Sequence, residues 1–413
     1  MITKNSSIIH VYYTGRSEKL AVGRLALKEH RIFFEYDSEF LKTGLEMSPF
    51  KLPLKSGIFA FKDHLFDGLF GVFNDSLPDG WGRLLVDRKL IQLGINPGAL
   101  SPIDRLLYVG SRGMGALAYE PEVKAVAPSH HEDLDQIANE TFQFQENNND
   151  DRFIDDLLAL NGSSAGARPK ILVKLKEDSF LIADEGRGTS NNEWIIKFRS
   201  FLDPMDIGPI EYAFHLMAEA ANLDVPEAKL FKSKNGFGYF GVKRFDRLDG
   251  RNIHMHTISG LLHADHRIPS LDYEAIMKTT LWLTKSGQEC EKQFRAAVFN
   301  VLTHNRDDHA KNFSFLMDEK GLWRVSPAYD LVFSSGPAGE HCTMVMGEGK
   351  KPKREHLLKL GEIVSLKKST ALKIIEDVKQ ISSKWPHFAN EAGVCQKSLE
   401  MIQLSLTKIA KGF

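Results

Sequence analysis

The chain has 413 residues, of which 42% are hydrophobic and 26% charged, as in soluble globular proteins large enough for two or three domains. Its 53 lysines and arginines nearly balance 54 aspartates and glutamates, and the net charge of −1 excludes a global basic field for direct binding of nucleic acid. The three cysteines are far apart and match no metal-binding spacing, which indicates reduced thiols in a cytoplasmic protein. The chain lacks the apolar core of a signal peptide and any apolar run of membrane-spanning length, so we expect no membrane association.

The first region of the chain is expected to be a small α+β module. Alternating and β-branched residues predict three strands, at 8–13, 20–27 and 32–36. A Pro-Asp-Gly turn at Pro78–Gly80 then feeds a helix that begins near Arg83. We interpret this turn and helix as structural, and we assign the module no chemistry of its own. The polar stretch from Ala125 to Asp151 predicts a domain boundary, and a helix over part of this stretch is also compatible with its sequence.

A second region carries features typical of a phosphate-binding lobe. Ser163–Lys170 is a loop of small residues, which let backbone N–H groups approach phosphate oxygens, although a plain hairpin turn uses the same residues. Lys197 lies in an apolar predicted strand, where a phosphate is a suitable partner and a solvent-facing position is the alternative. Glu211, in the first turn of a predicted helix, either stabilises that helix end or pairs with Lys197.

The segment from His304 to Asp330 carries the strongest chemical pattern. Asp307 and Asn312 stand five positions apart, which is the Asp-to-Asn spacing of a protein-kinase catalytic loop. A predicted hairpin over 313–325 can return Asp330 to Asn312. Asp307 is suited to accept the proton of an attacking hydroxyl, and the oxygens of Asn312 and Asp330 are suited to bind Mg²⁺. A polar loop whose Asp and Asn side chains cap turns is the alternative.

The remaining part of the chain is predicted to be mainly helical. Helices expected at 273–283 and 291–304 would form the core of a lobe that carries the catalytic loop, and 356–413 continues in helices. His254 and His256 form a His-x-His pair, but no cysteine or carboxylate arrangement supports it, so we expect no metal there.

Five segments in order resemble the signature motifs of the HipA family, the toxin serine/threonine kinases of bacterial toxin–antitoxin pairs. They are Phe73–Arg83 for the Leu-Leu-Pro-Asp-Gly signature, Ser163–Lys170 for S-x-x-G-A-x-x-K, Lys243–Arg247 for the E-R-F-D-R hinge, Asp307–Asn312 for the D-x-H-x-K-N catalytic loop, and Tyr329-Asp330 for the Y-D metal motif. Together these motifs span most of the chain and are far more specific than any one of them. Lys243 stands where the family has glutamate, and His304 stands where glycine is common.

The resemblance implies an α+β, two-lobed protein-kinase-like fold with a small N-terminal β-rich module and a mostly helical C-terminal lobe. The implied division is 1–125 for an N-terminal HipA-like module, 126–150 for a linker, 151–247 for a nucleotide-binding kinase N-lobe and 248–413 for a helical catalytic C-lobe. ATP and Mg²⁺ are the implied cofactors. Asp307 is then the catalytic base, and Asn312 and Asp330 hold the metal.

The resemblance also implies the residues that bind the nucleotide. They are Ser164, Ala165, Gly166, Ala167, Lys197, Lys243, Phe245, Asp246, His309 and Lys311. Among them, Lys197 contacts the phosphates, the backbone around Lys243 and Phe245 meets adenine, and Asp246 lies near the ribose.

Regulation and partners follow from the same resemblance. Ser163 matches the loop serine that such kinases autophosphorylate, and the sequence does not separate it from the adjacent Ser164. Nearly two added negative charges where phosphates must bind are a sufficient reason for inhibition. Family members bind a small helix-turn-helix antitoxin, a HipB-like protein, and contact DNA only through it, which agrees with the neutral charge of this chain.

The implied function is a Mg-ATP-dependent serine/threonine protein kinase that arrests growth. The best-known substrates of the family are aminoacyl-tRNA synthetases, notably the glutamyl enzyme. A kinase-like co-repressor without turnover and a small-molecule kinase of the aminoglycoside or lipid type are the alternatives. The intact catalytic residues argue against the first, and the N-terminal module together with Ser163 argues against the second.

Overall fold

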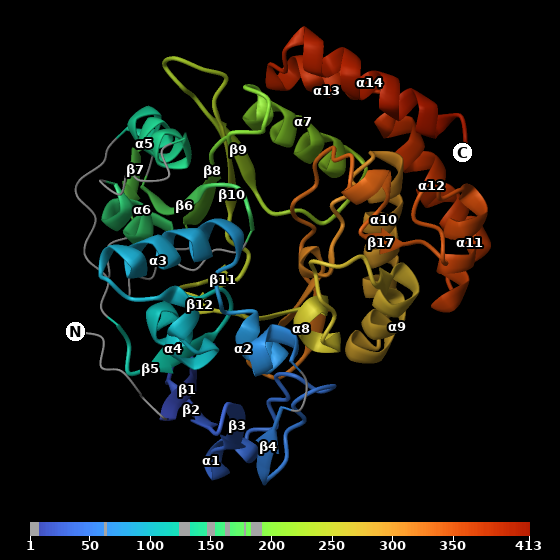
Figure 1. The fold of residues 1–413 in the computed structure, drawn as a ribbon. Coiled ribbons are helices and arrows are strands. Elements are labelled where there is room, and N and C mark those ends of the chain that lie inside the picture. The colour runs from blue at the N-terminus through green and yellow to red at the C-terminus, as the bar shows by residue number, and fades with distance from the viewer. Residues whose placement is uncertain are drawn as a thin grey trace.

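The structure is a computed structural model, and it describes residues 8–61, 64–123, 133–146, 153–161, 166–176, 179–182 and 192–413. It consists of an N-terminal module, a lobe built on a β-sheet, and a larger helical lobe (Figure 1). These parts match the predicted α+β architecture with a β-rich N-terminal module and a mostly helical C-terminal lobe.

The N-terminal module is an antiparallel sheet covered by short helices. Its strands are β1 (Ile8–Tyr13), β2 (Leu20–Lys28), β3 (Arg31–Tyr36), β4 (Ile58–Ala60) and β5 (Leu117–Glu120), in the order β4-β3-β2-β1-β5. Its helices are α1 (Ser38–Leu41), η1 (Leu65–Gly68), α2 (Gly71–Asn74), α3 (Gly80–Gln92), η2 (Pro97–Ala99) and α4 (Pro102–Val109). Alternate residues of β1, namely Ile9, Val11 and Tyr13, are buried in the core of the module, as the period of a half-buried strand requires. The three strands predicted from alternation are confirmed.

The second part is a five-stranded antiparallel sheet with the order β7-β6-β8-β10-β9. Its strands are β6 (Lys170–Lys176), β7 (Ser179–Ile182), β8 (Glu193–Lys197), β9 (Ala228–Phe231) and β10 (Tyr239–Lys243). The helices of this part are α5 (Leu134–Glu146), α6 (Ile154–Asn161) and α7 (Ile207–Ala220). Ile171 and Val173 of β6 and Trp194 and Ile196 of β8 point into one small core, so every second residue of each strand faces inward.

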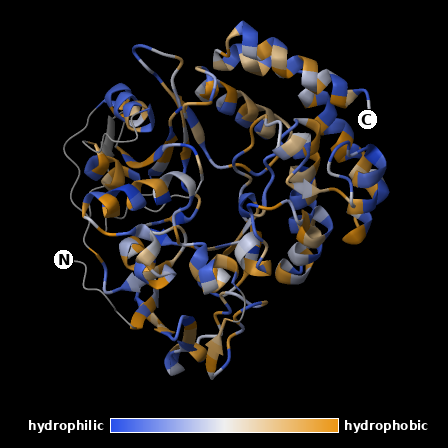
Figure 2. Ribbon diagram, in the orientation of Figure 1, coloured by the Kyte–Doolittle hydropathy of each residue, from blue (hydrophilic) through white to orange (hydrophobic). Residues whose placement is uncertain are grey.

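The helical lobe holds the largest core of the described chain. Its helices are α8 (Ile258–Leu262), α9 (Tyr273–Thr284), α10 (Gly287–Leu302), η3 (Ala310–Asn312), η4 (Pro337–Gly339), α11 (Arg354–Ile363), α12 (Lys368–Ser382), α13 (Trp385–Ala392) and α14 (Gln396–Ala410). Its short strands are β11 (Arg247–Leu248), β12 (Arg251–Asn252), β13 (His254–Thr257), β14 (Leu271–Asp272), β15 (Ser314–Met317), β16 (Trp323–Val325) and β17 (Thr343–Met344). Hydrophobic and hydrophilic residues both occur around α10, α12 and α14, as expected of helices that cover a core (Figure 2). Within the described ranges, no helix has both the length and the apolar character needed to cross a bilayer.

The stretch expected as a linker contains helix α5. Leu134, Ile137 and Phe144 of α5 are buried, and their spacing places them on one helical face. Many polar residues around these three hide the apolar stripe in the sequence. The helix therefore forms because it covers apolar surface of the neighbouring sheet and of α3, where Phe144 contacts Trp81.

The N-terminal module is tied to the helical lobe by a buried polar chain. Asp75, next to α2, lies 2.6 Å from Nδ1 of His256 on β13, and Ser48 Oγ lies 3.0 Å from Nε2 of the same ring. Asp75 also accepts hydrogen bonds from the backbone N–H and the hydroxyl of Thr257, both at 2.7 Å. Ser, His and Asp in this order are the residues of a hydrolase triad, but Ser48 is only 1% exposed, so no substrate can reach it. These buried hydrogen bonds therefore connect the two parts structurally.

The backbones of the same two parts also touch. A Cβ atom on Gly71 of α2 would lie 2.1 Å from the carbonyl oxygen of Gly260 on α8, so only glycine permits this approach. Figure 1 shows α2 beside α8.

We predict that Asp75→Ala destabilises the folded chain by about 3 kcal/mol, because buried donors of His256 and Thr257 lose their acceptor. Urea denaturation of the full chain measures the change, with Glu18→Ala, an exposed carboxylate of the same module, as control. Equal unfolding midpoints for the two variants would show that the tie contributes nothing to stability.

Candidate active site

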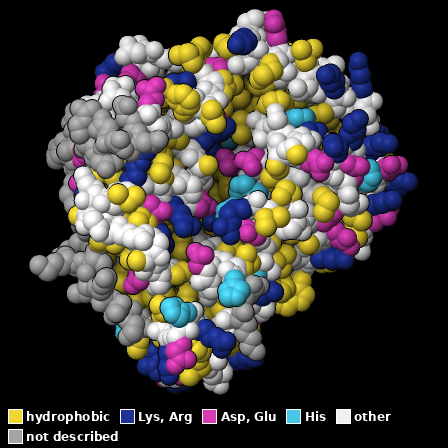
Figure 3. Space-filling view, viewed as in Figure 1, with side chains coloured by type: hydrophobic (Ala, Val, Ile, Leu, Met, Phe, Trp, Pro, Cys, Tyr) yellow, Lys and Arg dark blue, Asp and Glu magenta, His cyan; other side chains and the backbone are white. Residues whose placement is uncertain are grey.

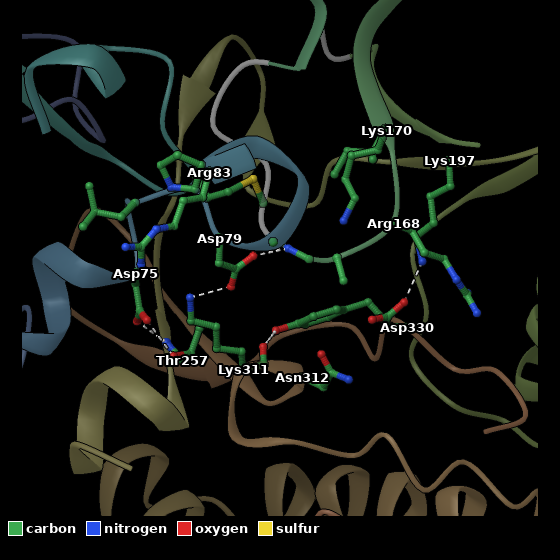
Figure 4. Close-up of a pocket in the computed structure, with 18 of the residues that line it drawn as sticks. Asp75, Asp79, Arg83, Arg168, Lys170, Lys197, Thr257, Lys311, Asn312 and Asp330 are labelled. Carbon is green, nitrogen blue, oxygen red and sulfur yellow. Dashed lines mark hydrogen bonds and ion pairs between the residues drawn. The ribbon is translucent and has the colours of Figure 1, made fainter. Parts of the chain in front are cut away.

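The three parts of the chain enclose one large cavity of about 1170 Å³. Figure 3 shows the molecule hollowed near its centre, with acidic, basic and histidine side chains gathered around the hollow. In the close-up, Asp79, Lys170, Lys197, Lys311, Asn312 and Asp330 surround a common opening (Figure 4). The cavity is larger than most small-molecule sites, and its charged wall is suited to an anionic ligand.

Lys197, at the end of β8, is held by two carboxylates. Its Nζ lies 2.8 Å from Oε2 of Glu211 on α7 and 2.6 Å from Oδ1 of Asp330. Burial lowers the pKa of Lys197, but the negative charges of Asp330 and Glu211 outweigh it and raise that pKa above its usual range. The structure thus resolves the two readings of Glu211, which pairs with Lys197 and is itself almost fully buried.

Asp330 is fixed in an unusual backbone conformation. Its φ of 57° lies in the left-handed region, which residues other than glycine adopt at a cost. Asn305 donates a hydrogen bond to its carbonyl at 3.2 Å, and the preceding Tyr329 donates to the carbonyl of Lys311 at 2.5 Å. The Lys197 ammonium holds the pKa of Asp330 well below its usual range. Its carboxylate is therefore ionised at neutral pH, which is the state in which a carboxylate can bind a cation.

The catalytic-loop segment approaches Asp330 from the helical lobe. Asn312 donates from its amide nitrogen to the carbonyl of Asp307 at 2.7 Å, which leaves its amide oxygen to face a ligand. Asp307 is exposed toward the cavity. The surrounding protein partly excludes water from its carboxylate, and this desolvation together with the negative charge of Asp330 raises the pKa of Asp307. The neighbouring His304, which stands where glycine is common in the family, has a φ of 58°.

Asp308 anchors this segment from beneath. It is fully buried and accepts hydrogen bonds from Tyr273 Oη at 2.9 Å and from the backbone N–H of Thr343 at 3.2 Å, and it lies 2.8 Å from His341 Nδ1. The sequence offers no signal that separates Asp308 from Asp307, because adjacent aspartates differ only in which one is buried.

The donor set fits a divalent cation of the magnesium type. Asn312 and Asp330 line the same cavity and offer one amide oxygen and one carboxylate. No group of three or more His, Cys, Asp or Glu side chains suited to a metal occurs among the described residues. Mg²⁺ bound together with a nucleotide needs only one or two protein ligands, since phosphates and water complete its shell.

Some residues of the hinge motif line the cavity, and others are buried in the protein interior. Lys243 and Phe245 line the cavity, whereas Asp246 is fully buried and accepts from Arg244 at 2.8 and 2.9 Å and from Arg247 at 2.8 Å. Asp246 also accepts from the backbone N–H of Gly115, in the N-terminal module, at 2.7 Å. Burial disfavours the charge, but the two arginines outweigh it and hold the pKa of Asp246 far below its usual range. The assignment of Asp246 to the ribose is therefore corrected, because its carboxylate is saturated by the link to the module.

The glycine-rich loop is described only in part. Ser163, Ser164 and Ala165 lie outside the described residues, while Gly166 and Ala167 line the cavity. His309 and Lys311 of the catalytic loop also line it.

Three charged residues line the cavity without a role in the sequence-based assignment. Arg168 pairs with Glu211 at 2.5 Å, and Lys170 lies at the start of β6 with its pKa lowered to about 8 by burial and by Lys197. Asp79, from the module that was assigned no chemistry, pairs with Lys311 at 2.6 Å. The Ser163–Lys170 motif contains the first two, but a partner 232 positions away gives no local signal for Asp79.

The two lobes and the cavity between them define a protein with a kinase-like fold. HipA of the toxin–antitoxin system of Shewanella oneidensis MR-1, solved with HipB and operator DNA, superposes with a TM-score of 0.67 at 17% identity, over 97% of this chain and 95% of that one. A family model of the HipA-like C-terminal domain matches residues 162–385, and a model of the HipA N-terminal domain matches residues 11–120. The chain belongs to the HipA family.

Two curated relatives come from Sinorhizobium fredii, and both bear provisional names as kinases. Y4dM is 28% identical over 190 residues, which cover 42% of this chain and 45% of that protein. Y4mE is 24% identical over 265 residues, which cover 60% of this chain and 54% of that protein. The chain thus spans about half the length of the curated relatives it matches.

We predict that the affinity of the cavity for a triphosphate falls about tenfold between about pH 7.5 and about pH 9.5, because Lys170, with a pKa of about 8, loses its charge. Lys197 keeps its charge over this range. Titration with a fluorescent ATP analogue measures the affinity, and Lys170→Arg, which stays charged, should flatten the curve. The same slope in Lys170→Arg would assign the pH dependence to another group.

Proposed function

We propose that this chain is a Mg-ATP-dependent serine/threonine protein kinase of the HipA toxin type. The observation that supports the proposal most strongly is the ammonium of Lys197 in the wall of the cavity, which pairs with Glu211 at 2.8 Å and with Asp330 at 2.6 Å. A lysine from a strand, a glutamate from a helix and an aspartate after the catalytic loop are the parts that kinases use to position a triphosphate. The names of the two curated relatives from Sinorhizobium fredii, which are both called kinases, also support the proposal.

Different residues of the cavity bind the phosphates, the metal ion and the adenine. Lys197 and Lys170 offer cationic partners to the phosphates of ATP, and Gly166 and Ala167 allow close approach of the loop backbone. Asn312 and Asp330 hold Mg²⁺, which when bound neutralises phosphate charge and orients the β- and γ-phosphates. Backbone of Lys243 and Phe245 faces adenine.

Asp307 accepts the proton of the substrate hydroxyl. Its carboxylate is exposed toward the cavity, so a serine or threonine side chain can reach it. Its raised pKa brings it closer to neutral pH, where a general base is more effective. The hydroxyl oxygen attacks the γ-phosphorus, the bond to the ADP oxygen breaks, and the proton goes to Asp307.

Autophosphorylation and partners complete the proposal. Ser163 and Ser164 precede Gly166 in the sequence by three and two positions, so a phosphate on either would add negative charge to the glycine-rich loop. A HipB-like helix-turn-helix antitoxin would supply the DNA contacts that a chain of net charge −1 lacks. The substrate would be a cytoplasmic protein. An aminoacyl-tRNA synthetase, such as the glutamyl enzyme, is the example that the family suggests.

We predict that Asp307→Ala and Asp330→Ala each reduce phosphate transfer from labelled ATP by at least about 1000-fold, since the first removes the base and the second a metal ligand. Glu18→Gln, on an exposed turn of the N-terminal module, should label as the wild type does. Equal labelling of wild type and Asp307→Ala would remove the mechanism.

Mass spectrometry of the labelled wild type separates the remaining alternatives. Phosphoserine at Ser163 or Ser164, absent from a Ser163→Ala, Ser164→Ala variant, is the result expected of a HipA-type kinase. Nucleotide binding without any transfer would favour a co-repressor, and transfer to small molecules alone would favour a small-molecule kinase.

A further inference from the structure

Asp79 belongs to the N-terminal module, yet its carboxylate lies in the wall of the cavity (Figure 4). Oδ2 accepts a hydrogen bond from Lys311 Nζ at 2.6 Å, and Oδ1 accepts one from the backbone N–H of Gly166. Lys311 lies between Asp307 and Asn312 in the catalytic loop, and Gly166 lies in the glycine-rich loop. One carboxylate therefore connects the two loops that flank the proposed path of the phosphoryl group.

The turn that carries Asp79 is fixed against the glycine-rich loop. The backbone N–H of Trp81 donates to the carbonyl of Gly166 at 3.1 Å. A Cβ atom on Gly80 would lie 2.6 Å from Cα of Ala167, so the two backbones are in direct contact. Trp81 is 3% exposed and packs edge-on against Phe144 of α5 at 5.6 Å between ring centroids. Asp79 has little freedom to move relative to this loop.

The pair with Lys311 is charged and largely shielded from solvent. The side chain of Lys311 is 8% exposed and that of Asp79 is 22% exposed. Burial opposes ionisation of Asp79, but Lys311 and the Gly166 N–H outweigh it and lower its pKa to about 2. Asp79 is therefore ionised at neutral pH. Without Asp79, the ammonium of Lys311 would lie in the pocket wall with its nearest carboxylate removed.

We propose that Asp79 is a positioning residue for phosphoryl transfer, which acts through Lys311 and sets the spacing between the catalytic loop and the glycine-rich loop. The inference rests on the proposed kinase function and deepens it, because it makes the N-terminal module part of the catalytic unit. Asp79 touches neither the attacking hydroxyl nor the metal ligands. It holds Lys311 beside Asp307 and Asn312, and a displacement of about 1 Å in such a constellation can cost about 100-fold in rate.

The expected signature is a loss in kcat with little change in KM for ATP. Asp79→Asn keeps an oxygen for the Gly166 N–H but removes the charge that holds Lys311. It should lower kcat about 30-fold and change KM for ATP by less than about threefold, since Lys197, Lys170 and the hinge still bind the nucleotide. Glu18→Gln removes one exposed charge from the same module and should behave as the wild type.

A double-variant cycle tests whether Asp79 acts through Lys311. In a Lys311→Met background, Asp79→Asn should lower kcat by less than about twofold further, because the interaction is already absent. The double variant also removes both charges, so it leaves no unpaired lysine and should fold even where Asp79→Asn alone is unstable. All variants are measured as the full chain with labelled ATP.

Three results would overturn the inference. The kcat of Asp79→Asn could equal that of Glu18→Gln, the loss could be confined to KM, or the full loss could persist in the Lys311→Met background. A wild type that transfers no phosphate at all would instead contradict the proposed function, so the two failures are distinguishable.

Discussion

The ion pairs of Lys197 join the parts of the molecule that form the cavity. Its ammonium, on β8, meets Glu211 on α7 at 2.8 Å and Asp330 of the helical lobe at 2.6 Å. The lysine side chain is 12% exposed, so its charge requires these partners, and removing either carboxylate would leave a buried charge poorly compensated. Arg168 adds a second cation on Glu211. The two lobes are therefore linked by the ion pair between Lys197 and Asp330, and the phosphates of a bound triphosphate could replace Asp330 as the partner of Lys197.

The N-terminal module contributes directly to this arrangement. Arg244 and Arg247 of the hinge motif donate to the carbonyl of Gly113, and Asp246 accepts from the N–H of Gly115. Asp79 reaches the catalytic loop from the same module. The N-terminal module thus contacts the wall of the cavity at two places, the hinge motif and the catalytic loop. In this chain the kinase-like fold and the N-terminal module together form the wall of the cavity.

Local patterns in the sequence predict much of this structure, and long-range partners do not follow from them. The strands of the module follow from alternation. The pairing of Lys197 with Glu211 is one of two interpretations that the sequence leaves open, and the structure decides between them. The sequence around Asp79 indicates only a structural turn, because the partner of Asp79, Lys311, is 232 positions away. The sequence alone is compatible with Asp246 near the ribose, although the two arginines that saturate its carboxylate are its neighbours in the sequence. Asp246 is buried because the N-terminal module packs over the motif, and this packing leaves no local signal in the sequence. The polar stretch around α5 is compatible with a helix, but its sequence does not give the bounds of the helix, because only a few buried apolar residues hold α5 against the surface that it covers.

The structure of the full chain with Mg²⁺ and a non-hydrolysable ATP analogue tests the central claim most directly. We expect one ion in contact with the phosphates, Asn312 and Asp330, and we expect Lys197 to move from Asp330 to a phosphate oxygen while it keeps its contact with Glu211. A nucleotide bound away from Lys197, or an ion that contacts neither Asn312 nor Asp330, would contradict it.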